Sequence, residues 1–499
     1  MSPYPLVALL LLAYAAFCYY WWWRFQRRQA RLAAGFDAPV DGKTWLVAYA
    51  SQTGNAEHLA AQTAAQLQQA GWPVQLLPLN QLTVAQLQAC AGALFVVSTY
   101  GEGEAPDNGN RFMVRLEADF VDSLQYAVLA LGDRSYPAFC AFGHALHLAL
   151  QQRNAVALCD LVEVDQRDAG ALRHWQYYLG QLTGQHNVAD WFPVTYQPWQ
   201  LHRRVCLNPA SPGRPAFHLQ LRPEQSQWLS WQAGDIVEVG PGNSARRLEQ
   251  FWQQCNNPRL LAQRRQLDLL LQRKLLPAGP VDLAVDNLDS WLAALPDLPH
   301  REYSIASLPD SGCLDLLVRQ VRDEQGETGL GSGWLTEHPA PGDKVLLRVR
   351  SNSRFHPPAT ATPMILIGNG TGMAGLRAHL LHRVAQQQRD NWLLFGERTR
   401  AHDVFFAGDI LAWQASGFLP HLDLAFSRES DGSARYVQDL VRQQAAQIRE
   451  WVEQRAAVIY ICGSLQGMAQ GVEAELEAAL GKQALADLAE AGRYCRDVY

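Results

Sequence analysis

Apolar runs alternate with helix-forming segments over residues 41–192. Runs typical of buried strands lie at 45–50, 74–79, 93–99, 126–131 and 155–164. Stretches of helical length separate them, and the first, rich in alanine and glutamine, ends at Gly71. Because strands that alternate with helices form parallel sheets covered on both faces, this pattern predicts a doubly wound parallel sheet. Ligands of such a sheet bind at the carboxyl ends of its strands.

The pattern changes over residues 193–358. Strand-like runs follow one another with turn residues between most of them, which is typical of a small antiparallel barrel. These runs lie at 199–207, 216–222, 234–243, 301–307, 314–321 and 342–350. A segment rich in Leu, Gln and Arg interrupts them at about 246–297 and predicts a helical insertion.

Alternation returns over residues 359–499. A hydrophobic strand, a glycine-rich turn and the start of a helix follow one another within 364–376. Such a turn is typical of a dinucleotide-binding domain, although alone it is moderate evidence. The chain is therefore predicted to be a multidomain α/β protein that also contains a β-barrel.

Residues 4–23 form an uncharged apolar run of bilayer-spanning length. Four arginines follow it within residues 24–40, which favours a cytoplasmic position for the rest of the chain. The pattern predicts a single-pass anchor, a basic juxtamembrane linker over 24–40 and catalytic domains on the cytoplasmic side of the inner or plasma membrane. A cleaved signal peptide is the alternative, but the charge follows the apolar core and no small-residue cleavage site is present.

Length and composition narrow the class of protein. A chain of 499 residues suits about three domains. Its nine cysteines show no CxxC or Cys/His spacing, which indicates reduced thiols and predicts no metal site. Residues 41–192 carry 14 acidic and 7 basic side chains, so they suit a basic protein partner better than nucleic acid. Ordinary solubility charge explains this excess equally well.

Three loops after predicted strands carry candidate binding groups. Residues 51–56 offer hydroxyls and backbone N–H groups at a helix N-terminus, which suits a phosphate. They lack the GK[ST] ending of a nucleotide P-loop, which counts against ATP. Tyr100 and Tyr136 each stand beside glycines at later strand ends, where two aromatic rings can stack on a flat ring. Either tyrosine alone would be ordinary in a loop; three such loops in this order indicate a site.

The predicted barrel carries a second candidate site. In the strand at 301–304, alternation places Arg301 and Tyr303 on one face, where they suit a pyrophosphate and a ring. About 25 residues later, the small residues of 329–335 allow a backbone to approach a phosphate closely.

These segments resemble the motifs of the diflavin reductases, a family that includes the microsomal NADPH–cytochrome reductase and the sulfite reductase flavoprotein. The FMN motifs SQTGxA, [ST]TxGEG and LGDxxYxxF stand at 51–56, 98–103 and 131–139. The FAD motifs RxYSxxS and G[VL]x[ST]xWL stand at 301–307 and 329–335. The NADP loop GxGTGxAPF matches 368–376 except at Gly375 and Leu376, and the insertion at 246–297 is shorter than the family's connecting domain.

The resemblance implies three cofactors and a set of residues for each. FMN is assigned to Ser51, Gln52, Thr53, Gly54, Asn55, Ala56, Ser98, Thr99, Tyr100, Gly101, Leu131, Gly132, Asp133, Tyr136, Phe139, Cys140 and Asp165. FAD is assigned to Arg301, Glu302, Tyr303, Ser304, Leu317, Val318, Arg319, Gly329, Leu330, Gly331, Ser332 and Tyr499. NADPH is assigned to Gly370, Thr371, Gly372, Ser427, Arg428, Arg435, Tyr436, Gln438 and Cys462.

The resemblance also implies a direction of electron flow. Ser304, Cys462 and Asp497 would surround the nicotinamide and the flavin, and Tyr499 would cover the FAD ring and move aside. Electrons would pass from NADPH to FAD, then to FMN, and then to an external one-electron acceptor such as a haem, sirohaem or other metal-centre protein. The cations and donors at 427–438 favour NADPH over NADH.

Three other functions stay open from the sequence alone. One is the flavoprotein component of sulfite reductase, against which the predicted anchor counts because that flavoprotein is ordinarily soluble. Another is a ferric-chelate reductase. The third, from a different class, is a flavin-binding scaffold without catalysis, which the intact Ser304, Cys462 and Asp497 disfavour.

Overall fold

The chain divides at Phe192 into two compact units, called unit 1 and unit 2 below. The computed structural model describes residues 14, 17, 19–20, 36, 38–100, 103–106, 108–117, 121–186, 188–192, 195–255, 261–277, 288–322, 326, 328–429 and 435–499. Among these residues no helix combines the length and apolarity needed to cross a bilayer. The anchor predicted at 4–23 lies outside the described residues except for Tyr14, Phe17, Tyr19 and Tyr20.

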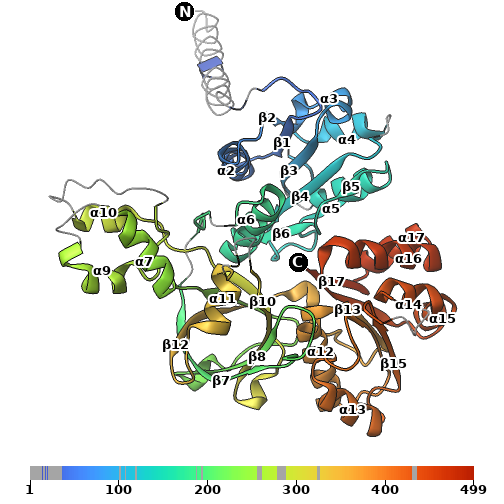
Figure 1. Cartoon of the computed structure of the whole chain (residues 1–499). Helices are drawn as coiled ribbons and strands as arrows, with labels where there is room; N and C mark the ends of the chain where they lie inside the picture. The colour runs from blue at the N-terminus through green and yellow to red at the C-terminus, as the bar shows by residue number, and fades with distance from the viewer. Residues whose placement is uncertain are drawn as a thin grey trace, which may run out of the picture. The chain divides into compact units, whose positions relative to one another are not determined.

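Unit 1 is built on a parallel sheet with the order β2-β1-β3-β4 (Figure 1). Its strands are β1 (Trp45–Ala50), β2 (Val74–Pro78), β3 (Gly92–Ser98), β4 (Gln125–Gly132), β5 (Val156–Ala157) and β6 (Val162–Asp165). The short strands β5 and β6 pair with successive parts of the same edge of β4. The strand runs expected from the apolar pattern therefore form one parallel sheet.

Helices cover both faces of this sheet. They are α2 (Asn55–Gln69), α3 (Val84–Ala89), α4 (Asn110–Glu117), α5 (Ala141–Gln151) and α6 (Ala169–Thr183), with a 3-10 turn η1 (Leu79–Gln81). A hydrophobic core joins alternate residues of β1 to α3, α4 and α5. On the other face α2 packs on α6, where the Trp175 indole donates to Thr63 Oγ1 at 3.0 Å. This arrangement leaves the carboxyl ends of the strands available to the binding loops.

Unit 2 begins with an antiparallel sheet of six strands in the order β10-β9-β12-β7-β8-β11. They are β7 (Gln197–Cys206), β8 (Ala216–Pro223), β9 (Ile236–Gly240), β10 (Arg301–Ser304), β11 (Leu314–Arg319) and β12 (Lys344–Arg350). A bridge between Ile305 and Leu316 joins the two outer strands, so the sheet closes into a barrel around an apolar core. Short turns η2 (Ser226–Trp228), η4 (Pro309–Ser311) and η5 (Ser353–Phe355) and the helix α11 (Leu330–Glu337) complete it.

Helices lie between β9 and β10 in the segment predicted as an insertion. Those described are α7 (Ala245–Gln254), α9 (Arg264–Leu271) and α10 (Leu288–Ala294). They have a small core of their own, which includes Phe251, Trp252 and Leu271.

The rest of unit 2 is a second parallel sheet with the order β15-β14-β13-β16-β17. Its strands are β13 (Met364–Asn369), β14 (Asn391–Glu397), β15 (His421–Phe426), β16 (Val458–Gly463) and β17 (Tyr494–Val498). The helical elements are η6 (Gly370–Gly372), α12 (Met373–Ala385), α13 (Ala407–Ala415), α14 (Val437–Gln443), α15 (Ala445–Gln454), η7 (Leu465–Ala469), α16 (Gln470–Leu480) and α17 (Lys482–Glu490).

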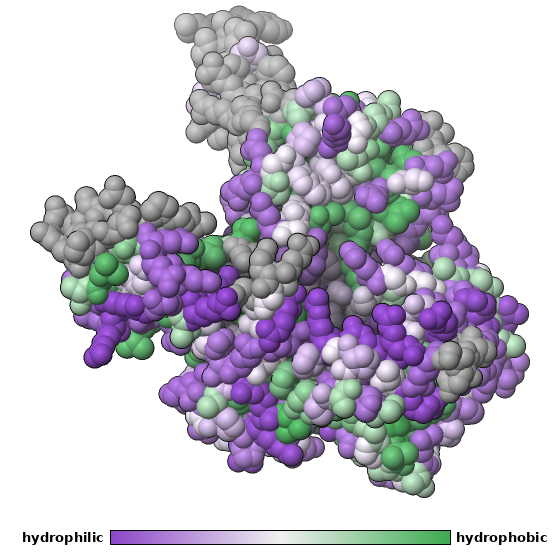
Figure 2. Space-filling view, in the orientation of Figure 1, coloured by the Kyte–Doolittle hydropathy of each residue, from purple (hydrophilic) through white to green (hydrophobic). Residues whose placement is uncertain are grey.

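The two parts of unit 2 share a core. Ala306, Leu317 and Phe355 from the barrel side pack with Leu366 of the second sheet and Leu376 of α12. Hydrophilic residues cover most of the visible face of unit 2 (Figure 2), as expected for a surface in water. The shared core fixes the barrel against the strand ends of the second sheet, which positions the residues described next.

Candidate flavin and nucleotide sites

The loop between β1 and α2 in unit 1 has the local geometry of an anion site. Gly54 has φ 88°, a left-handed conformation that suits glycine, and it lets the chain turn directly into α2. The Gly54 N–H donates to Ser51 Oγ at 2.9 Å, and the Ser51 N–H donates to Asn108 Oδ1 at 3.0 Å. Backbone N–H groups at the start of a 15-residue helix attract a phosphate.

Two residues near this loop were missed by the sequence analysis. Asn108 fixes the Ser51 backbone from another loop. Arg167 donates through Nη2 to Asn55 Oδ1 at 2.5 Å, which brings a cation to the start of α2. Arg167 has φ 75°, an uncommon conformation for a residue with a side chain, and nothing in its sequence context predicts it.

The two tyrosines assigned to the FMN ring are both half exposed, at 52% each. They follow neighbouring strands, because β3 pairs with β4. Tyr100 forms an isolated antiparallel β-bridge with Glu104, and the Tyr136 N–H donates to Asp133 O at 3.1 Å. Large aromatic surfaces at adjacent strand ends fit a flat aromatic cofactor that covers them. Gly101, assigned to the same site, lies outside the described residues.

Other residues assigned to FMN fix the conformation of these loops through hydrogen bonds and close packing. Cys140 is buried with φ 54° at the start of α5, and its thiol donates to Ala130 O at 3.3 Å. A Cβ on Gly132 would lie 2.8 Å from Cys140 N, so only glycine fits there. Hydrogen bonds from the Ser135 side chain and backbone lower the pKa of Asp133, and Asp165 accepts the Arg134 N–H at 3.0 Å.

In unit 2, three residues distant in sequence converge on one carboxylate oxygen. Ser304 Oγ donates to Asp497 Oδ2 at 2.7 Å, and Cys462 Sγ donates to the same oxygen at 3.6 Å. Ser304 ends β10 of the barrel, whereas Cys462 and Asp497 are register partners on β16 and β17. The site therefore lies where the barrel meets the second sheet.

The chemistry of this cluster follows from its burial. Cys462 is fully buried; this burial, and secondly the charge of Asp497, raises the pKa of its thiol well above the ordinary value. Cys462 is therefore a neutral thiol at neutral pH and acts as a hydrogen-bond donor rather than as a nucleophile. A Cβ on Gly375 would lie 3.1 Å from Cys462 Sγ and 3.8 Å from Ser304 Cβ, so Gly375 leaves room beside the cluster.

Tyr499 contacts both the end of β16 and the glycine-rich turn. Its backbone N–H donates to Gly463 O and its carbonyl accepts the Leu465 N–H, both at 3.0 Å. Its hydroxyl donates to Thr371 Oγ1 at 3.1 Å, and the residue is 39% exposed. The anchored backbone and the part-exposed ring suit a side chain that covers a flat ligand.

The segments assigned to FAD meet at the barrel wall. A Cβ on Gly331 would lie 2.3 Å from Arg301 Cγ and 2.9 Å from the Tyr303 hydroxyl. Ser332 Oγ, at the start of α11, accepts the Val321 N–H at 3.0 Å. Only a residue without a side chain permits this approach at position 331, and the result is a cradle with a guanidinium and a phenol, which fits a flavin nucleotide.

Three of the residues assigned to FAD lie at the end of β11. Leu317 and Val318 are core residues at 3% and 1% exposure. Arg319 pairs with Glu397 at the end of β14, and both lie 3.7 Å from the position of a Cβ on Gly370. Arg319 therefore stands beside the nucleotide turn.

Glu302 belongs to a charged cluster on the barrel wall. It lies opposite the fully buried Glu238 on β9 and pairs with Arg350 at 3.2 Å. Arg348 and Arg350 also pair with Glu238, at 3.6 and 3.7 Å. His300 completes a group of three possible metal ligands with the two glutamates, but the two arginines already balance both carboxylates.

The residues assigned to NADPH follow β13 and β15. In the turn Gly370–Gly372, a Cβ on Gly372 would lie 2.0 Å from Cys462 O, so glycine is required for the approach to β16. After β15, Arg435 Nη2 donates to Ser427 O at 3.4 Å, and Tyr436 is 52% exposed. Gln438 packs against Gly471.

Comparisons with known proteins agree with this geometry. The flavodoxin family model matches residues 47–175, and the oxidoreductase NAD-binding domain model matches 366–474. The sulfite reductase [NADPH] flavoprotein alpha-component of Shewanella sp. (strain ANA-3) is 30% identical, and the match covers 94% of this chain and 92% of that protein. The protein of the same name from Bacillus subtilis (strain 168) is 28% identical, over 94% and 91%. This chain belongs to the diflavin reductase family.

As a diflavin reductase it is an NADPH-dependent flavoprotein oxidoreductase, and its cofactors are FMN, FAD and NADPH. The prediction that the chain is an NADPH-dependent diflavin oxidoreductase that passes electrons to an external acceptor is confirmed. The predicted location in the inner or plasma membrane is wrong. It depended on a spanning helix, none is found among the described residues, and the relatives carry the name of a sulfite reductase flavoprotein component.

Proposed function

We propose that Ser304, Cys462 and Asp497 form the site at which NADPH is oxidised. The observation that carries this proposal is the 2.7 Å hydrogen bond from Ser304 Oγ to Asp497 Oδ2, which joins the barrel to the second sheet. Asp497 orients the Ser304 hydroxyl and the neutral Cys462 thiol, and the buried surroundings exclude water from both. When bound, FAD accepts a hydride from NADPH and FMN releases electrons one at a time.

The closed antiparallel barrel favours the assignment of residues 193–358 to a ferredoxin-reductase-like FAD domain. Arg301 would bind the pyrophosphate, Tyr303 would lie against the flavin, and Gly331 leaves the space between them. Tyr499 would cover the other side of the ring until the nicotinamide replaces it. The second sheet, over 359–499, would bind NADPH along its carboxyl edge.

The parallel sheet of unit 1 and its loops favour the assignment of residues 41–192 to an FMN domain. Residues 51–56 would bind the phosphate at the start of α2, with Arg167 as an additional cation. Tyr100 and Tyr136 would flank the ring from the ends of β3 and β4.

The acceptor we propose is the metal-centre component of a sulfite reductase. The relatives that match 94% of the chain bear the name of its flavoprotein component. The predicted membrane location, which counted against this acceptor, is contradicted by the described residues and by the relatives. The excess of 14 acidic over 7 basic side chains in residues 41–192 suits a basic docking surface on such a partner.

Purified full-length chain tests these assignments. We expect FMN and FAD in equal amounts, and reduction of ferricyanide and cytochrome c that depends on NADPH. Addition of a sulfite reductase metal-centre component should give sulfite-dependent oxidation of NADPH. A preparation that lacks one of the flavins after reconstitution would contradict the two-flavin assignment, and normal cytochrome reduction without sulfite turnover would contradict the acceptor.

A further inference from the structure

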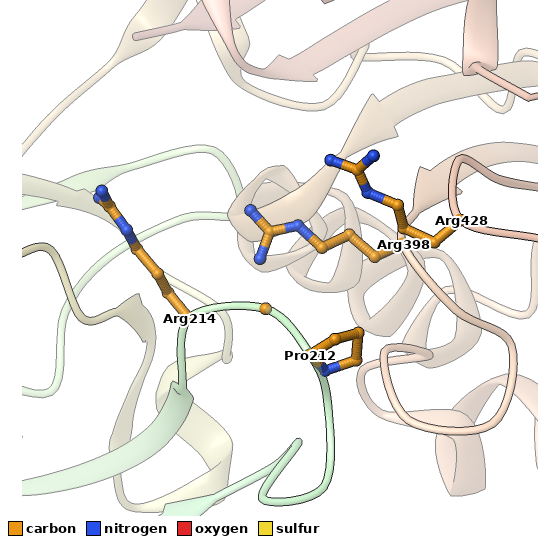
Figure 3. A pocket seen from close by; sticks show the side chains of 5 residues that line it. Pro212, Arg214, Arg398 and Arg428 are labelled. Carbon is orange, nitrogen blue, oxygen red and sulfur yellow. The ribbon is translucent and has the colours of Figure 1, made fainter.

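An arginine in unit 1 has surroundings opposite to those of a group of arginines in unit 2. Arg214, Arg398 and Arg428 stand together around a pocket of about 330 Å³ beside the ends of β14 and β15 (Figure 3), and Arg428 is one of the residues assigned to NADPH. Arg134, in the loop after β4, instead stands among carboxylates of its own unit. The protein itself therefore holds the charge of Arg134 in place, without a ligand.

Arg134 belongs to the loop that carries Tyr136. Its guanidinium carbon lies 4.6 Å from the centre of the Phe139 ring, and its backbone N–H donates to Asp165 Oδ1 at 3.0 Å. Phe139 and Tyr136 are both assigned to FMN, and Tyr136 is assigned to a face of the flavin ring. The positive charge of Arg134 is therefore fixed within the loop to which FMN is assigned.

Two carboxylates on β6 hold this guanidinium. Glu163 pairs with Ala130 of β4 in the sheet register, and Asp165 pairs with Gly132, so the two carboxylates follow each other on one face of the strand. Arg134 Nη2 lies 3.5 Å from Glu163 Oε2, and Arg134 Nε lies 3.9 Å from Asp165 Oδ2. The Glu163 side chain is 11% exposed and that of Asp165 is 38% exposed. Water therefore screens the interaction with Glu163 less.

The second oxygen of Glu163 is also engaged. His144, in the first turn of α5, places its Nε2 2.7 Å from Glu163 Oε1. One carboxylate thus contacts both the loop after β4 and the helix that follows this loop. Because both oxygens have partners, the Glu163 side chain has one preferred orientation, and the position of the Arg134 guanidinium follows from it.

We propose that Glu163 is a positioning residue that holds the Arg134 charge in the FMN loop and thereby sets the reduction potential of the bound FMN. The proposal rests on the proposed assignment of FMN to unit 1. Reduction adds electrons to the ring, so a nearby cation favours binding of the reduced form and a nearby carboxylate favours the oxidised form. Arg134 and Glu163 therefore act on the potential with opposite signs.

The test uses the full-length chain with Glu163→Gln, Arg134→Gln and the double substitution. Anaerobic spectroscopic titration against redox dyes measures the potential of FMN, and the FAD of unit 2 is the internal reference that should not shift. Glu163→Gln should raise the affinity for reduced over oxidised FMN about tenfold, or ~30 mV for a two-electron couple. Arg134→Gln should lower this ratio by a similar factor, and the double variant should lie between the two.

Matched controls separate charge from structure. Glu163→Asp keeps the negative charge and should stay closer to the unaltered potential than Glu163→Gln. Asp122→Asn removes an exposed carboxylate before the amino end of β4, at the opposite edge of the sheet and roughly 25 Å from the loop, and should leave the potential unchanged.

The outcomes distinguish a positioned charge from a purely structural contact. Opposite shifts in Glu163→Gln and Arg134→Gln would support the proposal. Weaker binding of oxidised and reduced FMN by one common factor leaves the potential unchanged; that result, or shifts of the same sign in both variants, would overturn it. If Glu163→Gln fails to retain FMN, Arg134→Gln carries the test, because its half-exposed side chain is not part of the core. An unaltered chain that bound no FMN would instead overturn the proposed function of unit 1.

Discussion

At the scale of single residues, the proposed hydride site of unit 2 depends on one oxygen atom. Asp497 Oδ2 accepts hydrogen bonds from Ser304 of the barrel and from Cys462 of the second sheet. The two donors would otherwise be free to rotate, since a hydroxyl and a thiol each choose their own acceptor. Asp497 is therefore a positioning group for both.

Asp497→Asn should slow NADPH oxidation about 10- to 100-fold, because the two donors lose a charged acceptor. Stopped-flow measurement of flavin reduction by NADPH reports this step, and the FAD content should stay unchanged. Asp487→Asn, on the exposed side of α17, is the matched control. An unaltered rate in Asp497→Asn would remove Asp497 from the proposed site.

Tyr499→Ala should relax the preference for NADPH over NADH. Without the ring, no side chain competes with the nicotinamide for the flavin, so kcat/KM for NADH, the weaker substrate, should rise more than kcat/KM for NADPH. Stacking of this kind contributes roughly 0.5–1.5 kcal/mol, which corresponds to a change of about 2- to 10-fold in the ratio. The ratio of kcat/KM for the two cofactors is the measurement. An equal ratio in the variant would contradict the gating role.

His379, in α12, couples the stability of unit 2 to pH. It lies against Phe355 and Tyr460 at 5.0 and 4.6 Å between ring centroids, and burial lowers its pKa from 6.5 to about 3. The unfolded chain takes up a proton below about pH 6.5 and the folded chain does not, so stability is complete above that pH and is lost as the pH falls toward 3.

His379→Phe should remove this loss. Between about pH 7 and pH 5 the free energy of unfolding of unit 2 should fall by about 2 kcal/mol less in the variant than in the unaltered chain. Urea titrations at the two pH values measure the difference. His402→Gln, at an exposed histidine, should leave it unchanged, and an identical pH effect in His379→Phe would refute the assignment.

At the scale of elements, the start of α2 illustrates how a turn and a helix make a binding site together. Gly54→Ala should destabilise unit 1 by about 1–2 kcal/mol, because its φ of 88° is strained for any residue with a Cβ. FMN affinity should fall with it, since the N–H groups of α2 would be redirected. Fluorescence titration with FMN and thermal unfolding measure both; Gly42→Ala, with open space around its Cβ, is the control.

The apolar pattern predicted most of the elements because burial on both faces leaves continuous hydrophobic runs in parallel strands. The runs at 45–50 and 93–99 coincide with β1 and β3, and the barrel runs coincide with β7 to β12. The insertion was located, but the division of its helices depends on a small core that local sequence does not specify.

The candidate sites were predictable only where a motif carries the chemistry locally. Ser304, Cys462 and Asp497 came from separate motifs, and their meeting at one oxygen required the fold. Arg319 was assigned to FAD by the resemblance alone, and its ion pair with Glu397 on another sheet required the fold. The contact of Arg167 with Asn55 depends on the positive φ of Arg167 and on a distant neighbour, which sequence patterns do not encode.

At the scale of the whole molecule, charge should govern how the protein meets its acceptor. Residues 41–192 carry 14 acidic and 7 basic side chains, so a basic acceptor should be attracted over about a Debye length. Raising the ionic strength from about 20 mM to about 300 mM should slow cytochrome c reduction several-fold at low acceptor concentration. Ferricyanide, an anion, is the control and should not slow; equal behaviour of the two acceptors would argue against charge-guided docking.

The span between Ser304 and Asp497 also has a consequence for biosynthesis. The two residues are 193 positions apart, and at about 5–20 residues per second a ribosome needs roughly 10–40 s to travel from one to the other. During that time the barrel can fold, yet β17 has not joined β16 and the Ser304 hydroxyl lacks its carboxylate. The proposed hydride site therefore cannot be complete in a nascent chain before nearly all of unit 2 exists.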